Sequence, residues 1–324
     1  LRPTVGMDRK RRAVKPRCNL AHRTAHHALK HRVRVLRSHV RAAAAHDVEG
    51  IHDLRVASRR LRAVLGDYAD LFRKRALKPF RKRMRSITRG LGKARESDGT
   101  LALWRKLRRR APKSTHPAIS RAARMLRELR AAESGPVDAS CALARSPEFR
   151  AEHQTLLHAI KRPKRCYLRT AEATLRRRYA ALVAAHRKWI GRPSDETLHR
   201  VRVAFKKLRY SCEIAENVYG QPMEDFIGQM KNAQELLGDW NDSRVLRDYL
   251  VVCSQKIAGI TGPFAELERI CDADAQTLLD NFARSAPELF NDAAQSAAVT
   301  LFASPQTSCC NSRRARTAAT QRKR

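Results

Sequence analysis

One basic segment headed by a histidine occurs twice in this chain, and the duplication limits the folds that are available to it. The segment HDLRVASRRLR spans His52–Arg62, and HRVRVAFKKLR spans His199–Arg209, 147 residues later. Further matches lie 146 residues apart: Leu29 with Leu175, Val33 with Tyr179, Leu36 with Leu182, Phe80 with Phe226, Met84 with Met230, Leu91 with Leu237 and Gly92 with Gly238. Two similar halves of this kind predict an internal pseudo-twofold axis.

Apolar residues recur at helical spacing in both halves. Leu29, Val33, Leu36 and Val40 are spaced 4, 3, 4, which is typical of one face of an amphipathic helix. The alternating pattern of a strand does not occur in the sequence. We therefore predict an all-α protein with two four-helix bundles. Each bundle would contain a basic leading helix, the helix of the histidine-headed segment, a helix with Phe and Met, and a closing helix.

Glycine, proline and charge runs suggest where these halves begin and end. The predicted divisions are a basic N-terminal extension at 1–19, a first helical repeat at 20–135, a linker at 136–165, a second helical repeat at 166–300 and a disordered basic tail at 301–324. Ser194 or Asp195 is expected to cap the helix that carries His199.

The charge balance of the chain favours a polyanionic partner. There are 68 Lys and Arg against 31 Asp and Glu, a formal net charge of +37. Such a charge repels itself in a compact state, and a bound polyanion relieves that repulsion. Nucleic acid, inorganic polyphosphate and anionic lipid all satisfy this condition. The segment 259–295 is acidic, so most of the positive charge lies before it and in the tail.

Cysteine usage and hydropathy bear on the compartment. Eight cysteines occur without a Cys-x-x-Cys pair, which indicates a reducing, cytoplasmic compartment. The sequence has no apolar run of about 18 residues, so no membrane span is expected. No secretory signal is recognised, and a transit peptide at the Arg-rich start is the alternative. Residues 1–6 precede Met7 and could lie upstream of a true start.

The duplicated segments place a row of cations on one side of each predicted helix. The first motif stripe consists of His52, Arg55, Arg59 and Arg62, and the second motif stripe of His199, Arg202, Lys206 and Arg209. Both rows are spaced 3, 4, 3 and lie opposite apolar residues. Like charges at this spacing repel, and interleaved Glu would remove the cost. A solvated face explains one such stripe, but two matched stripes indicate polyanion binding.

A third row of cations lies on the predicted helix with Phe80 and Met84. Lys78, Lys82, Arg85 and Arg89 are spaced 4, 3, 4 in that row. Its counterpart in the second half keeps only Lys231. The binding surface should therefore be more basic in the first half, although this row alone is more typical of a solvated face.

With these motifs the chain resembles the CHAD domain (conserved histidine α-helical domain) family. The pattern H-x-x-R-V-x-x-[RK]-[RK]-L-R and the Leu-Gly segments carry the resemblance over about residues 20–295. It implies two four-helix bundles with a basic groove between them, binding of inorganic polyphosphate, and association with polyphosphate granules. It assigns the phosphate contacts to His52, Arg55, Arg59, Arg62, Arg85, His199, Arg202, Lys206, Arg209 and Lys231. The chain departs from the family at Glu96, where Asp is usual. It shows no Glu-x-Glu-x-Lys signature of a CYTH domain, so a stand-alone module is expected.

The chemistry of the stripes agrees with this function. Arg presents a forked set of donors to phosphate oxygens, and Lys acts as a point charge. A motif histidine gains charge on protonation, so tighter binding is predicted below about pH 6.5. Aromatic residues make up only 6% of the chain and do not interleave the stripes, which argues against stacking of single-stranded bases.

Three other interpretations remain open. The first is a non-specific nucleic-acid-binding protein that uses the basic C-terminal tail. The second is a metal site at His22 and His26 or at His27 and His31, which lack further ligands. It includes a hydrolase site at Asp239, Asp242 and Asp248, where Asp242 and Ser243 are more typical of helix caps. The third is a scaffold that recruits other granule proteins. We predict a binding module without catalysis, cofactor or metal.

Overall fold

The computed structural model describes residues 21–162, 167–257, 259 and 261–303. Its α-helices are α1 (Ala21–Ala44), α2 (Val48–Asp67), α3 (Lys74–Gly90), α4 (Gly92–Arg110), α5 (His116–Ala131), α6 (Ser134–Arg145), α7 (Pro147–His158), α8 (Tyr167–Gly191), α9 (Asp195–Tyr219), α10 (Gln221–Lys256), α11 (Thr261–Phe290) and α12 (Asp292–Ala303). Two short 3₁₀-helices, Ala69–Leu71 and Lys113–Thr115, join α2 to α3 and α4 to α5. The all-α prediction is confirmed.

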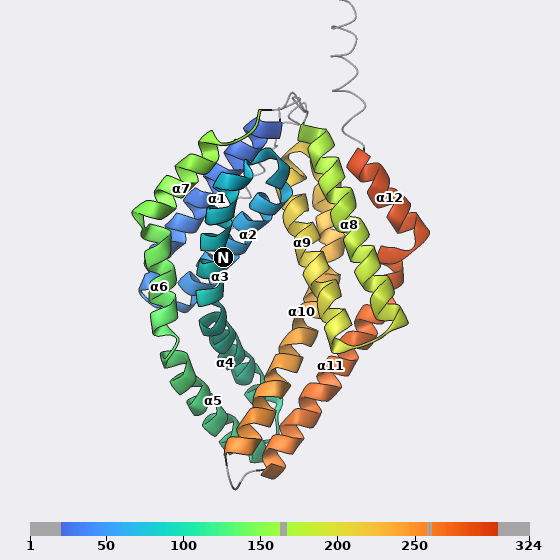
Figure 1. Cartoon of the computed structure of the whole chain (residues 1–324). Coiled ribbons are helices and arrows are strands. Elements are labelled where there is room, and N and C mark those ends of the chain that lie inside the picture. The colour runs from blue at the N-terminus through green and yellow to red at the C-terminus, as the bar shows by residue number, and fades with distance from the viewer. Residues whose placement is uncertain (1–20, 163–166, 258, 260, 304–324) are drawn as a thin grey trace, which may run out of the picture.

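The helices form two sides that meet at both ends of the molecule (Figure 1). On one side α1 packs against α2, and on the other α8 packs against α9. The two sides contact each other through α2 with α9 and through α1 with α8. At the far end α4 contacts α10, where the α4–α5 and α10–α11 pairs converge.

Apolar side chains form two cores, and both halves contribute to each. The main core includes the predicted stripe of α1, with Leu29, Val33, Leu36 and Val40 all buried. It continues through α2 and α3 into α8, α9 and α10. The second core lies at the far end and joins side chains of α4 and α5 to those of α10 and α11. Neither half therefore has a hydrophobic core of its own.

Local sequence explains where the helices of the two motif stripes begin. The side chain of Asp47 accepts a hydrogen bond from the backbone nitrogen of Gly50 at 2.6 Å and caps α2. Gly50 is required there, because a Cβ would lie 2.6 Å from the backbone of Ala42 in α1. Ser194 forms a capping box with Thr197 at the start of α9, which confirms one of the two predicted caps.

The structure places helices where the sequence analysis expects a linker. Most of residues 136–165 belongs to α6 and α7, which pack against α1 and α3. Val137, Cys141 and Ala144 are spaced 4, 3 and are buried in the main core. Pro147 occupies the first turn of α7, where proline is tolerated. The Gly and Pro residues here begin helices rather than separate domains.

A second difference concerns the closing helix of each half. In the first half Leu91 separates α3 from α4, as predicted. In the second half α10 runs without a break through Leu237 and Gly238. One glycine within a helix costs only about 1 kcal/mol, which packing on α9 and α11 offsets. The predicted disordered tail at 301–324 is wrong at its start, because residues 301–303 form the end of α12. The rest of that tail and the predicted N-terminal extension at 1–19 lie outside the described residues.

Two carboxylates hold the two sides together near the contact of α2 with α9. Asp67 of α2 is buried and accepts hydrogen bonds from Arg178 of α8 at 2.7 Å and from Ser211 of α9 at 2.6 Å. Glu213 of α9 forms an ion pair with Arg60 of α2 at 3.1 Å. These contacts are between residues more than 100 positions apart, so they fix the relative position of the halves.

Replacing Asp67 with alanine should lower the free energy of unfolding by about 2–4 kcal/mol, because Arg178 and Ser211 lose their partner in a partly buried place. Urea denaturation followed by circular dichroism measures the change. The matched control is Asp280→Ala, which removes an exposed carboxylate bonded only to the side chain of Gln276. The control should change the free energy of unfolding by less than about 0.5 kcal/mol. Equal losses in the two variants would contradict a special role for Asp67.

Candidate anion-binding site

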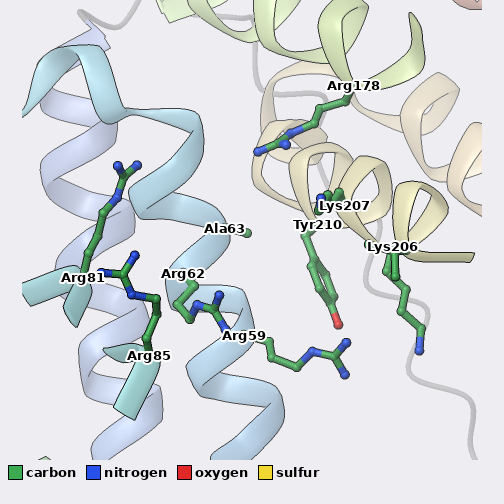
Figure 2. A pocket seen from close by; sticks show the side chains of 10 residues that line it. Arg59, Arg62, Ala63, Arg81, Arg85, Arg178, Lys206, Lys207 and Tyr210 are labelled. Carbon is green, nitrogen blue, oxygen red and sulfur yellow. The ribbon is translucent and has the colours of Figure 1, made fainter. Parts of the chain in front are cut away.

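A pocket of about 380 Å³ lies between the two sides of the molecule. Its walls come from α2 and α3 on one side and from α8 and α9 on the other (Figure 2). The lining residues are Arg59, Arg62, Ala63, Arg81, Arg85, Arg178, Val203, Lys206, Lys207 and Tyr210. Seven of these ten side chains are cationic, and none is a carboxylate.

Two of the lining arginines have partners within the protein. Arg178 donates to Asp67 at 2.7 Å, and Arg81 donates to the backbone carbonyl of Leu65 at 2.6 Å. The other five lining cations are Arg59, Arg62, Arg85, Lys206 and Lys207, and in the part of the chain that the structure describes none has a hydrogen bond or ion pair through its side chain. These five groups are free to bind an anion.

Four of the ten predicted site residues line the pocket. They are Arg59 and Arg62 from the first motif stripe, Arg85 from α3 and Lys206 from the second motif stripe. The stripe residues nearer the N-termini of the two helices do not line the pocket; they are His52 and Arg55 on α2 and His199 and Arg202 on α9. The structure thus brings Arg59 and Arg62 of the first stripe together with Lys206 of the second, while Arg209 at the end of the second stripe lies outside the pocket.

Arg55 and Arg202 occupy matching positions of the two stripes and have similar surroundings. In both side chains the Nε is buried and has no hydrogen-bond partner. Burial lowers the pKa of Arg55, and the charges of Arg59 and Arg95 lower it further. Burial also lowers the pKa of Arg202, where Asp242 opposes the shift. Guanidinium groups stay protonated despite such shifts, so these are half-buried charges, each with a buried and unused Nε donor.

Lys206 has the most perturbed ammonium group of the pocket. Burial, together with the charges of Arg202 and Arg59, lowers its pKa to about 7, and Asp242 opposes the shift. Arg59 belongs to α2, whereas Lys206 and Arg202 belong to α9. Like charges from the two halves therefore repel across the pocket when no anion is bound.

The motif histidines contact residues that follow the Leu-Gly segments. The Nε of Arg95 donates a hydrogen bond to the Nδ1 of His52 at 2.6 Å. In the second half the Nδ1 of His199 lies 3.3 Å from the Oδ1 of Asn241. Burial and the Arg95 charge lower the pKa of His52. The Nδ1 of His52 already accepts the hydrogen bond from Arg95, and it would have to give up this bond to bind a proton. This geometry opposes the expectation that His52 gains charge below about pH 6.5.

The two remaining predicted residues have carboxylate neighbours. The Nε of Arg209 lies 3.4 Å from Glu213, an ion-pair distance without hydrogen-bond geometry. Lys231 is exposed and lies 3.6 Å from Glu235, one turn further along α10. Neither residue lines the pocket. Each would have to leave its carboxylate before contacting phosphate.

Sequence analysis did not single out Arg81, Arg178, Lys207 and Tyr210, which complete the pocket. Lys207 follows Lys206 directly, and Arg178 ends the run Arg176–Arg178. A helical wheel assigns each residue to a side of its own helix, but it does not say which other helix faces that side. Only the packing of α8 on α9 brings Arg178 to the pocket.

A comparison with protein-family models identifies the family of this chain. The model of the CHAD domain family matches residues 27–251, which is more than half of the chain. The chain belongs to the CHAD domain family. The resemblance inferred from the duplicated motif is thereby confirmed.

Two solved structures share the fold. The crystal structure of the CHAD domain from the plant Ricinus communis has a TM-score of 0.61 and 18% identity, and the match covers 89% of this chain and 94% of that chain. PptA from Streptomyces chartreusis has a TM-score of 0.59 and 16% identity, with 83% of this chain and 99% of that chain covered. No curated protein sequence matches this chain.

Two further properties concern the described residues as a whole. None of their helices combines the length and hydropathy that a membrane crossing requires. No group of three or more His, Cys, Asp or Glu side chains within these ranges is placed to hold a metal ion. The His22–His26 and His27–His31 spacings therefore do not gain further ligands from neighbouring described helices.

Replacing Lys206 with methionine should stabilise the unliganded protein, because it removes a charge that burial and Arg59 disfavour. The pKa of Lys206 is about 7 in the folded chain, below its usual value. The unfolded chain therefore binds more protons between about pH 7 and pH 10, and wild-type stability rises with pH across that window. The gain from Lys206→Met should be about 1–2 kcal/mol at pH 6 and should shrink towards pH 10.

Thermal unfolding at several pH values measures this gain. Lys207→Met is the matched control, because it shortens the neighbouring lining residue to the same apolar group. A destabilising effect of Lys206→Met at pH 6, or equal gains in both variants, would contradict the repulsion inferred at Lys206.

Proposed function

We propose that this CHAD protein binds inorganic polyphosphate in the pocket between α2, α3, α8 and α9, as a binding module without catalysis. The observation that carries the proposal is the set of five lining cations without internal partners, drawn from both halves. The unused buried Nε donors of Arg55 and Arg202 next to Arg59 add to it. Cations held this close to one another are stabilised by a ligand that supplies several negative charges at once.

The shape and composition of the pocket favour polyphosphate over nucleic acid at this place. A polyphosphate chain is narrow and carries about one charge per phosphate, whereas a duplex is far wider than a pocket of 380 Å³. Single-stranded nucleic acid is bound by successive aromatic side chains. Tyr210 is the one aromatic residue among those that line the pocket.

The proposed contacts follow the geometry. Arg59, Arg62, Arg85 and Lys206 would contact phosphate first, together with Lys207. Arg offers two parallel donors to phosphate oxygens, and Lys offers a point charge. His52, Arg55, His199, Arg202, Arg209 and Lys231 stay in the proposal as contacts of a chain long enough to extend beyond the pocket. Such a protein would act in the cytoplasm on polyphosphate granules, where other granule proteins are candidate partners.

The pocket variant Arg59→Gln/Arg62→Gln/Lys206→Gln should weaken binding of long-chain polyphosphate by about 100-fold or more, since each charge-assisted hydrogen bond contributes about 1.5–3 kcal/mol. Isothermal titration calorimetry at about 0.15 M salt measures the affinity. The α5 control, Arg121→Gln/Arg124→Gln/Arg127→Gln, removes the same number of charges from an exposed face. It should weaken binding less than about threefold. A similar loss in both folded variants would mean that bulk charge, and not the pocket, binds the polyanion.

Binding should also depend on pH through Lys206. Phosphate favours the charged ammonium, so binding takes up a proton wherever the free pocket holds Lys206 neutral. With a pKa of about 7, affinity should be nearly constant below pH 6 and should fall roughly tenfold from pH 6 to pH 8. Lys206→Arg should flatten this dependence, whereas Lys207→Arg should preserve it. A flat wild-type profile, or an equally steep one in Lys206→Arg, would exclude Lys206 as the titrating group.

A further inference from the structure

A further row of cations, separate from the two motif stripes and from the row on α3, lies on the outer side of α1, and none of its residues lines the pocket. The α1 row consists of Arg23, His27, Lys30, Arg34, Arg37 and Arg41, spaced 4, 3, 4, 3, 4 along the helix. All six side chains are exposed. At about 1.5 Å of rise per residue, the α1 row extends over about 27 Å.

The α1 row has no internal counter-charges in the part of the chain that the structure describes, where no carboxylate pairs with any of its six residues. The adjacent Glu152 of α7 is instead paired with Arg83 of α3 at 2.8 Å. On the same helix as Glu152, burial lowers the pKa of His153 to about 4, and the nearby charges of Arg37 and Lys30 contribute to that shift. The surface beside α7 therefore carries an uncompensated positive field.

The matching positions of the second half show that the fold does not require cations here. Residues 146 positions further on are Arg169, Ala173, Arg176, Ala180, Val183 and Arg187 on α8. This side of α8 packs against α12, and Ala180 and Val183 line a common hollow with Val299. Thus α12 covers the side of α8 that contains Ala180 and Val183, whereas the matching side of α1 is exposed and has a cationic residue or a histidine at every position of the row.

We propose that the α1 row is a docking surface for duplex nucleic acid, which it contacts through the phosphate backbone independently of the polyphosphate pocket. A duplex is a rigid polyanion with about one charge per 1.7 Å of its axis. A ridge of about 27 Å therefore faces about eight base pairs of phosphates that are already ordered. A flexible polyphosphate chain would lose conformational freedom on a convex ridge without being enclosed, so it fits the pocket better than the α1 row.

The composition of this side of α1 favours a nucleic-acid duplex over a membrane as its partner. The other exposed residues of α1 are His26, His31, Ser38 and Ala42, of which only the small Ala42 is apolar. A helix that lies in a membrane interface inserts large apolar side chains, and the large apolar side chains of α1 are buried in the main core or, like Val35, packed against it. The side chains of the α1 row are assigned to phosphate contacts, which carry no base-sequence information, so binding should be independent of base sequence.

The test compares three variants of the full chain, each lacking three cations. The α1 variant is Lys30→Gln/Arg34→Gln/Arg37→Gln, and the pocket variant and the α5 control are those described above. Fluorescence anisotropy measures binding to a duplex of about 20 base pairs over a series of salt concentrations. The α1 variant should bind the duplex at least tenfold more weakly at about 0.15 M salt, with a salt slope reduced by about 2.7. It should bind long-chain polyphosphate as the wild type does.

Each alternative result overturns the proposal. Equal weakening by the α1 variant and the α5 control would assign duplex binding to bulk charge. Loss of duplex binding in the pocket variant alone would place the duplex at the pocket. Binding of vesicles with anionic lipid through the α1 row, without duplex binding, would assign the surface to a membrane. Circular dichroism confirms that each variant is folded, and polyphosphate titration of the same samples tests the pocket separately.

Discussion

Repulsion between cations on α2 and α9 is the constraint that the rest of the structure accommodates. The two helices contact each other, and each presents a motif stripe to the region between the halves. Burial is the main cause that lowers the pKa of Arg202 and of Lys206, and the charge of Arg59 on the opposite helix lowers both further. Because native proteins are stable by only about 5–15 kcal/mol, such repulsion has to be offset close to where it acts. Asp67 and Glu213 do this, since each carboxylate joins α2 to the other half beside the pocket.

The shared cores complete this arrangement. The main core extends from α1 and α2 into α8 and α9, and the second core joins α4 and α5 to α10 and α11. Burial of apolar surface thus opposes separation of the two sides at both ends of the molecule. The walls of the pocket are fixed before a ligand arrives, so less ordering has to occur on binding. The polyanion proposed above would relieve this repulsion, and it would stabilise the fold by mass action to the extent that it binds the folded chain more tightly than the unfolded one.

The sequence predicts those features that depend on one helix at a time. The 3, 4, 3 spacing places Arg59 and Lys206 on the correct sides of their helices, and both line the pocket. The same spacing places His52 on the side of α2 that carries the first motif stripe. It does not reveal the hydrogen bond to the Nδ1 of His52 from Arg95, which is 43 residues away in sequence. Contacts of this kind depend on how α4 packs beside α2, and periodicity carries no information on that. Lys231 is different, because its partner Glu235 lies four residues further on and can be seen in the sequence.

The two halves also differ in which residues they share. Matching helices have similar residues on one side and different residues on the other. On α2 and α9 the motif stripes are cationic in both copies, and each wall of the pocket contributes charges from its stripe. On α1 and α8 the outer positions meet different surroundings, and their composition differs accordingly: α12 packs on α8, while α1 remains exposed. A substitution on the outer side alters one surface, whereas a substitution at Arg59 alters the field at four neighbouring cations at once. The outer sides are therefore where a second binding surface can arise without disturbing the first.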